Sequence, residues 1–310
     1  MNPLQLSGHE KRLYLCEDPS CITRQLNGVQ LTLAQVGRLR DDVSTDEITP
    51  VAILSYYDER LGEFAHTGLK CADQTPIARK ALREAGFAVL VAGRRYGKGS
   101  SREHSPTAEK LAGIQLVIAE SFERIYRQNA DNIGLFTSTD FSLLDRLEKG
   151  DTLTVEDLVA DRDPLAEAVL RAGGLLHWGQ KHLVATTITT SHVACPVEQP
   201  LTLFEKILTR RLLPTPYTPD RPYVGAGVFV RTDWRFIHEY YTGMAHTLMN
   251  KALDEHMHLV NPEQIVVFED HTSYVHESPA HISAGLIPNM LSMSQAQLKF
   301  VQKFDLRRSE

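Results

Sequence analysis

The stretch Gly97-Lys98-Gly99-Ser100-Ser101-Arg102-Glu103-His104 places two glycines, two serine hydroxyls and a guanidinium immediately before a helical pattern. The apolar run at residues 87–93 predicts a short buried strand, and residues 107–113 predict a helix with Pro106 in its first turn. Unpaired amides at a helix start attract anions, and an arginine binds a carboxylate through two hydrogen bonds. The order strand, turn, helix therefore indicates a carboxylate-binding turn.

A purely structural interpretation of the same turn stays open at this point. Ser100 or Ser101 would cap an ordinary helix, and Glu103 would be the acidic residue of its first turn. The glycine spacing matches neither the Walker motif nor the dinucleotide-binding fingerprint. Other segments of the sequence are needed to distinguish a helix cap from a binding site.

The composition is that of an ordinary globular protein. Of its 310 residues, 42% are hydrophobic and 23% are charged, which suffices for two domains with separate cores. The net charge is −6 and the basic residues are scattered, so we expect no nucleic-acid partner. No apolar run has the length of a membrane span, and the first residues do not resemble a secretion signal. We therefore expect a cytoplasmic protein that does not bind membranes.

The sequence predicts no metal site in this chain. Its four cysteines, none in C-x-x-C spacing, are Cys16, Cys21, Cys71 and Cys195. The histidines at 256, 258, 276 and 281 show no recurring spacing with a cysteine or a carboxylate, so we interpret them as scattered solvent histidines.

The sequence pattern predicts two α/β domains. Residues 1–184 alternate short aliphatic runs, such as residues 115–119, with helical stretches. Residues 185–200 are small, polar and β-branched and predict an extended linker. Residues 201–310 contain an amphipathic helix and two strand patterns, at 227–230 and 264–268, and predict a smaller, partial α/β domain.

Several separated segments resemble the aconitase and isopropylmalate isomerase superfamily. Within the first domain they are residues 40–50, the turn at 97–104, residues 121–135 and residues 163–175. After the linker, shorter resemblances to the family's large, cluster-bearing part lie at residues 202–208, 233–239 and 270–271. The resemblance implies an aconitase-type swivel domain of the β/β/α kind, followed by a truncated first part of the large-subunit domain, in the order seen in bacterial aconitase B.

The resemblance also implies roles for residues of the turn. Ser100 matches the serine that removes a proton from carbon, and Ser101 and Arg102 match groups that hold substrate carboxylates. A serine base needs its charged form stabilised by the helix start and by the arginine. Arg60 lies near the place of another carboxylate-binding arginine of the family.

Candidate residues of the second domain are Asp270, His271 and His238. Asp270 and His271 resemble the pair that protonates the departing hydroxyl, with the carboxylate orienting the imidazole as general acid. The alternative is an exposed pair at a strand end. His238 aligns with a substrate-contacting position, and the equally open alternative is a buried structural histidine.

The family's G-D-S-H-T block and its three cluster cysteines do not occur in these 310 residues. We therefore expect no cofactor bound by this chain and a [4Fe-4S] cluster supplied by a partner subunit. The first hypothesis is an aconitase-like hydro-lyase or isomerase subunit that dehydrates and rehydrates a hydroxy di- or tricarboxylate. Two alternatives stay open: a cluster-free isomerase or related proton-transfer enzyme on a polycarboxylate, and a non-catalytic remnant that binds a carboxylate or scaffolds a partner.

Overall fold

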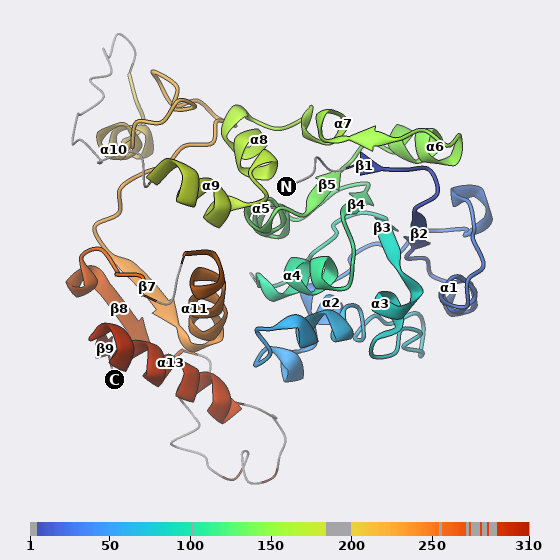
Figure 1. Ribbon diagram of the computed structural model, residues 1–310, viewed down its shortest axis with the longest axis horizontal. Coiled ribbons are helices and arrows are strands. Elements are labelled where there is room, and N and C mark those ends of the chain that lie inside the picture. The colour runs from blue at the N-terminus through green and yellow to red at the C-terminus, as the bar shows by residue number, and fades with distance from the viewer. Residues whose placement is uncertain are drawn as a thin grey trace.

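The computed structural model describes residues 5–100, 102–183, 200–253, 256–270, 273, 280, 284 and 290–309. It has a mixed α/β architecture with one parallel sheet in the N-terminal part and a second, smaller parallel sheet in the C-terminal part (Figure 1). The predicted α/β class is confirmed. No helix in the described ranges is long and apolar enough to cross a lipid bilayer.

The first sheet consists of parallel strands in the order β2-β3-β4-β5. Their bounds are β2 (Lys11–Tyr14), β3 (Phe87–Ala92), β4 (Leu116–Ala119) and β5 (Phe136–Ser138). Every residue of β3 and β4 is buried, as expected for parallel strands that are covered on both faces and therefore read as continuous aliphatic runs. The strands predicted at 87–93 and 115–119 are confirmed to within one residue.

Helices surround this sheet and join its strands. The remaining elements of the N-terminal part are α1 (Pro19–Leu26), η1 (Leu33–Gln35), α2 (Thr45–Ile48), η2 (Val51–Ile53), η3 (Glu59–Phe64), α3 (Ala81–Ala85), α4 (His104–Leu111), α5 (Arg124–Ile133), α6 (Ser142–Glu148), α7 (Val155–Val159), α8 (Pro164–Arg171), α9 (Leu175–Leu183) and the antiparallel pair β1 (Gln5–Leu6) and β6 (Leu153–Thr154). Helix α4 begins three residues earlier than predicted, because Pro106 is accommodated in a first turn whose amides have no helical partner anyway.

The second sheet has the order β7-β8-β9, with all strands parallel. The C-terminal elements are α10 (Leu203–Arg211), β7 (Arg235–His238), α11 (Glu239–Leu253), η4 (Pro262–Gln264), β8 (Ile265–Phe268), α13 (Met290–Phe304) and β9 (Arg307–Ser309). Ile265 and Val267 of β8 form a small core with Phe300 and Leu306. The strand predicted at 264–268 is confirmed as β8.

The C-terminal part packs against the N-terminal part at two places. Met244 of α11 is 1% exposed and belongs to the core of the first sheet. Trp178 of α9 stacks on Phe229 with ring centroids 4.9 Å apart. The strand predicted at 227–230 is wrong: there is only an isolated bridge between Val230 and Leu212, because Phe229 packs on α9 and not into a sheet. Residues 184–199 lie outside the described ranges, so the linker stays a prediction.

Candidate active site

Two of the segments singled out in the sequence lie side by side at the carboxyl end of β3. Residues 40–45 run along residues 93–98, and their backbones form hydrogen bonds of 2.7–2.9 Å at several steps. Gly97 N–H donates to Val43 O at 2.9 Å, and Thr45 N–H donates to Lys98 O at 2.7 Å. Segments about fifty residues apart therefore build one structure, in which backbone hydrogen bonds hold the first residues of the turn.

Gly97 explains why the turn needs glycine. Its φ is +79°, and a Cβ at this position would lie 2.2 Å from Cγ of Tyr126 on α5. An L-residue would meet both backbone strain and a clash with a buried ring. Because Tyr126 belongs to the third segment, residues 121–135, the close contact brings three of the four predicted segments together at the turn.

Arg102 is the buried cation of this site. Its side chain is 8% exposed, and its Nη1 donates to Asp46 Oδ1, a residue of the first turn of α2. Its Nε is buried and has no hydrogen-bond partner in the described part of the chain. A buried unpaired N–H group costs free energy, and a bound carboxylate would satisfy it. Six other arginines of the described chain also have a buried, unpaired Nε, so what marks Arg102 is that this free donor lies at the turn, where an anionic ligand could use it.

The N-cap position of α4 is not one of the two serines before Arg102. Helix α4 begins at His104, its N-cap position is Glu103, and that residue makes no side-chain cap hydrogen bond. The interpretation of Ser100 or Ser101 as the N-cap is therefore wrong. Ser100 is exposed at the end of the turn, while Ser101 lies outside the described residues.

A buried carboxylate, Glu109, lies beneath the turn. It is 0% exposed, and it accepts hydrogen bonds from Tyr96 on Oε1 and from Tyr126 on Oε2. His66 Nε2 lies 2.9 Å from Oε1. Burial, and next the charge of Glu109, raise the pKa of both tyrosines well above their ordinary value, which keeps the phenols protonated as donors. These residues, which we call the Glu109 network, link Tyr96, which precedes Gly97 in the turn, to Tyr126 of α5.

His104, the last residue of the motif, is a structural residue. It is 1% exposed, and its Nε2 lies 3.0 Å from the carbonyl oxygen of Leu54. Burial lowers its pKa to about 4, so the imidazole is neutral at physiological pH. It cannot act as a general acid there.

The second group of candidates lies at the carboxyl ends of β7 and β8. His238 is the last residue of β7, and Asp270 follows β8 by two residues. Both are joined to Glu239, which is 0% exposed: the Asp270 N–H donates to Glu239 Oε2 at 3.0 Å, and His238 Nδ1 lies 3.9 Å from the same oxygen. Parallel strands bring these residues to one sheet edge. His271 lies outside the described residues.

Tyr241 of α11 lies between the two groups. Its ring centroid is 4.5 Å from that of His238. On its other side, burial and the charge of Glu103 raise the pKa of Tyr241, whereas the charge of Arg102 lowers it. The first turn of α11 therefore connects the sheet edge that carries Asp270 with the start of α4.

Arg60 lies apart from the turn. It is bound to Asp58, with Nη2 to Oδ2 at 2.7 Å, and its guanidinium lies 4.8 Å from the centroid of the Tyr56 ring. Its side chain is 60% exposed. The described residues show no contact between Arg60 and the turn, so its proposed role in carboxylate binding receives no support from this geometry.

The cysteines of the described chain do not fit an iron–sulfur cluster. Cys16, Cys21 and Cys71 are buried among the core residues of the first sheet. Burial raises the pKa of the Cys16 thiol to about 12 and raises that of Cys71, whereas cluster ligands are thiolates. The described residues contain no group of three metal-ligating side chains, and Cys195 lies outside them.

Comparison with known proteins identifies the class of protein to which this fold and turn belong. The family model described as "Aconitase C-terminal domain" matches residues 59–139. The 3-isopropylmalate dehydratase small subunit 2 of Archaeoglobus fulgidus is 39% identical over 158 residues, which cover 46% of this chain and 90% of that protein. The 3-isopropylmalate dehydratase small subunit of Thermodesulfovibrio yellowstonii is 32% identical over 163 residues, which cover 48% of this chain and 94% of that protein.

The chain therefore belongs to the aconitase and isopropylmalate isomerase superfamily. The resemblance in the sequence is confirmed. Among solved structures, 3-isopropylmalate dehydratase of Methanocaldococcus jannaschii matches with 29% identity and a TM-score of 0.35, over 46% of this chain and 90% of that one.

Proposed function

We propose that this chain is the swivel-bearing subunit of an aconitase-like enzyme that dehydrates and rehydrates a hydroxy di- or tricarboxylate. The observation that carries the proposal is Arg102: a guanidinium 8% exposed, with an unpaired buried Nε, beside the exposed Ser100. The names of the relatives, dehydratase small subunits, support the same reaction class.

Binding in this proposal begins with the turn. One substrate carboxylate approaches Arg102, where it satisfies the unpaired Nε and competes with Asp46 for the guanidinium. Because Asp46 is 58% exposed, water solvates it when it is displaced. Ser101 adds a hydroxyl donor, and the backbone hydrogen bonds with residues 40–45 keep the turn preorganised.

The chemical step needs a base and an acid. Ser100, as the alkoxide, takes the proton from carbon, the electron pair of the C–H bond becomes the new C=C bond, and the hydroxyl leaves from the adjacent carbon. His271, oriented by Asp270, gives that hydroxyl its proton, so that one water is released. Hydration is the reverse sequence.

We place the family's [4Fe-4S] cluster on a partner subunit, because the described cysteines do not fit it. The small-subunit names of the relatives support a second subunit. The cytoplasmic location stays a prediction. A cluster-free isomerase is the second candidate function, and the same misfit of the cysteines is the observation that favours it.

The test measures turnover of 3-isopropylmalate and of citrate by the purified chain alone and mixed with a candidate cluster-bearing subunit. We expect activity only in the mixture, and a loss of kcat on the order of 100-fold or more in Ser100→Ala and Arg102→Lys. Arg94→Lys, an exposed arginine on the same loop that pairs with Glu120, is the matched control and should remain active.

Three outcomes decide between the hypotheses. Turnover by the iron-free chain alone would replace the proposal by the cluster-free isomerase. Unchanged activity in both turn variants would leave only the non-catalytic remnant. Loss of activity in Arg94→Lys as well would show that the assay responds to general damage of the loop and not to the proposed carboxylate site.

A further inference from the structure

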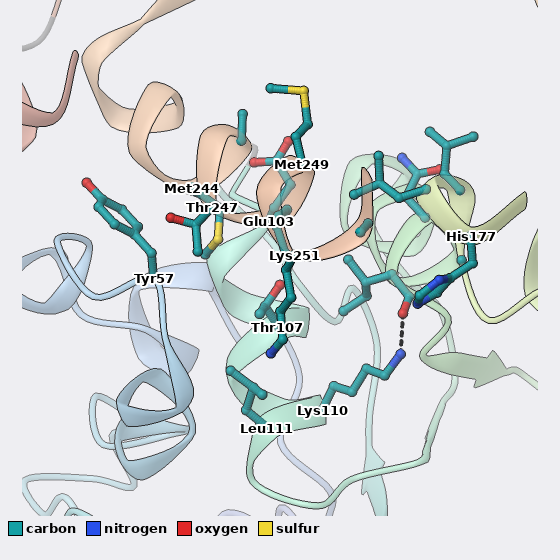
Figure 2. Close-up of a pocket in the computed structure, with 18 of the residues that line it drawn as sticks. Tyr57, Glu103, Thr107, Lys110, Leu111, His177, Met244, Thr247, Met249 and Lys251 are labelled. Carbon is teal, nitrogen blue, oxygen red and sulfur yellow. Dashed lines mark hydrogen bonds between the residues drawn. The ribbon is translucent and has the colours of Figure 1, made fainter. Parts of the chain in front are cut away.

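A cavity of about 660 Å³ lies where α11 packs against α4 and α9, on the side of α4 that carries Glu103 and Thr107 (Figure 2). Its size falls within the range of small-molecule sites. Helices from both parts of the chain supply its walls, so it exists only while α11 is docked. Of the described residues given a role in the proposed dehydration, Ser100, Arg102 and Asp270, none lines it.

The walls of the cavity are mostly apolar. The side of the N-terminal part contributes Leu111, Ile133 and Leu175, and α11 contributes Met244, Leu248 and Met249. Methionine side chains adapt their shape to different ligands. Such walls favour an aliphatic body over water, because water finds few hydrogen-bond partners there.

Of the carboxylates and lysines that line the cavity, all but Glu103 have a partner among the described residues; the imidazole of His177 lines it as well. Lys110 Nζ donates to the carbonyl oxygen of Ile133, and Lys251 Nζ lies 2.9 Å from Glu59 Oε1. Asp58 is bound by Arg60. The exception is Glu103, whose Oε2 is buried without a hydrogen-bond partner in the described residues.

Thr107 stands one helical turn after Glu103 on the same face of α4. It is 8% exposed, and its Oγ1 is a second buried polar atom without a partner in the described chain. Burial raises the pKa of Glu103, as expected of a carboxyl group that lacks a compensating cation. The apolar cavity therefore has one polar end, made of a carboxyl and a hydroxyl. A positively charged hydrogen-bond donor would satisfy both groups.

We propose that this cavity is a binding site for a small aliphatic primary amine, with its ammonium group on Glu103 and Thr107 and its hydrocarbon body between α4 and α11. An ammonium forms charge-assisted hydrogen bonds with the carboxylate, while a carboxylate head of equal length would meet like-charge repulsion. The preference is opposite to that of the turn, where Arg102 selects anions. Binding here is thus separable from the proposed substrate site, and its failure would leave the proposed function untouched.

The test titrates the full-length chain with hexylamine, 1-hexanol and hexanoate at equal ionic strength, and follows binding by calorimetry. We expect the amine to bind at least about tenfold more tightly than the carboxylate, a difference of about 1.4 kcal/mol. The titrations are repeated with hexylamine already bound, because hexanoate that binds without displacing the amine occupies the Arg102 turn. Hexanoate that displaces hexylamine with equal or higher affinity, or no saturable binding of the amine, would overturn the proposal. This comparison needs no variant.

Two variants locate the binding. Glu103→Gln should remove the preference for the amine and leave the affinity for hexanol unchanged, whereas Glu84→Gln, which removes an exposed carboxylate on α3, should change nothing. Ala245→Phe, which fills the cavity from α11, should weaken both amine and alcohol. If neither Glu103→Gln nor Ala245→Phe affects the amine, it binds elsewhere and the assignment is wrong.

Discussion

Glu109→Gln tests whether the buried carboxylate beneath the turn holds the turn in place. The wild-type carboxylate is 0% exposed and accepts from two phenols, with His66 Nε2 at 2.9 Å as its third neighbour. Glutamine keeps the size of the side chain but replaces one acceptor oxygen by an NH₂ donor. At least one of the phenol or imidazole donors then loses its acceptor inside the core.

The magnitude follows from these contacts. Hydrogen bonds to a charged group contribute about 1.5–3 kcal/mol each and neutral ones about 0.5–1.5, and a buried orphan donor costs about 1–3. Two weakened bonds, at about 1–1.5 kcal/mol each, and one orphan give a loss of roughly 3–6 kcal/mol in the free energy of unfolding. For a chain of this size 1 kcal/mol corresponds to roughly 2 °C, so the melting temperature should fall by roughly 6–12 °C.

The assay is urea unfolding followed by tyrosine fluorescence and circular dichroism, with Glu148→Gln as the matched control. Glu148 is exposed and accepts a single phenol hydrogen bond, from Tyr14 at 3.2 Å, so its substitution should cost less than about 1 kcal/mol. A loss for Glu109→Gln no larger than that of the control would refute the reasoning. It would mean that packing of the rings, and not the charged acceptor, maintains the turn.

The remaining predictions concern three other positions. Gly97→Ala should destabilise the chain by roughly 1–3 kcal/mol more than Gly37→Ala. Both glycines have φ between +70° and +80°, but only at Gly97 would the new Cβ lie against a ring. Equal losses of the free energy of unfolding in urea would show that the predicted clash does not occur. Burial lowers the pKa of His104 from 6.5 in the unfolded chain to about 4 in the folded one, so between these pH values only the unfolded chain takes up the proton. The free energy of unfolding is therefore highest above pH 6.5 and falls by up to roughly 3 kcal/mol as the pH drops from 6.5 toward 4. His104→Gln should make the free energy of unfolding less dependent on pH in this range. Gly243→Ala should weaken docking of α11 even though alanine favours helices, since the new Cβ would lie 2.4 Å from the Tyr57 ring, and hydrogen exchange of α11 would report it; slower exchange would contradict the prediction.

The parts of the fold that the sequence predicted are those decided by neighbouring residues. The aliphatic runs of β3 and β4 have a local pattern, and the turn between β3 and α4 is marked by Gly97 and Gly99, both at positive φ. The Glu109 network was missed because it joins residues up to 43 positions apart, and an isolated glutamate in a helix reads as a surface residue. Residues 227–230 have a strand composition but no neighbouring strand, which no local pattern reveals.

The candidate site was predicted in part for the same reason. Arg102 could be proposed from the sequence because the motif around it is contiguous, whereas Glu239 and Tyr241 could not. Their roles depend on β7 and β8 ending at one sheet edge and on α11 reaching back to α4. A single-sequence pattern contains no information about which sheet edge meets which helix start.

The first turn of α11 lies between the two halves of the proposed site. The proposed carboxylate-binding turn belongs to residues 97–102, and the predicted acid pair follows β8, more than 160 positions later in the sequence. Burial raises the pKa of Tyr241, and the charge of Arg102 opposes that rise. The ring centroid of Tyr241 lies 4.5 Å from that of His238. Glu239, two residues earlier, fixes the backbone of Asp270. Helix α11 also forms one wall of the cavity beside Glu103, so the cavity and the proposed substrate site both require α11 to be docked, although different groups bind at the two places.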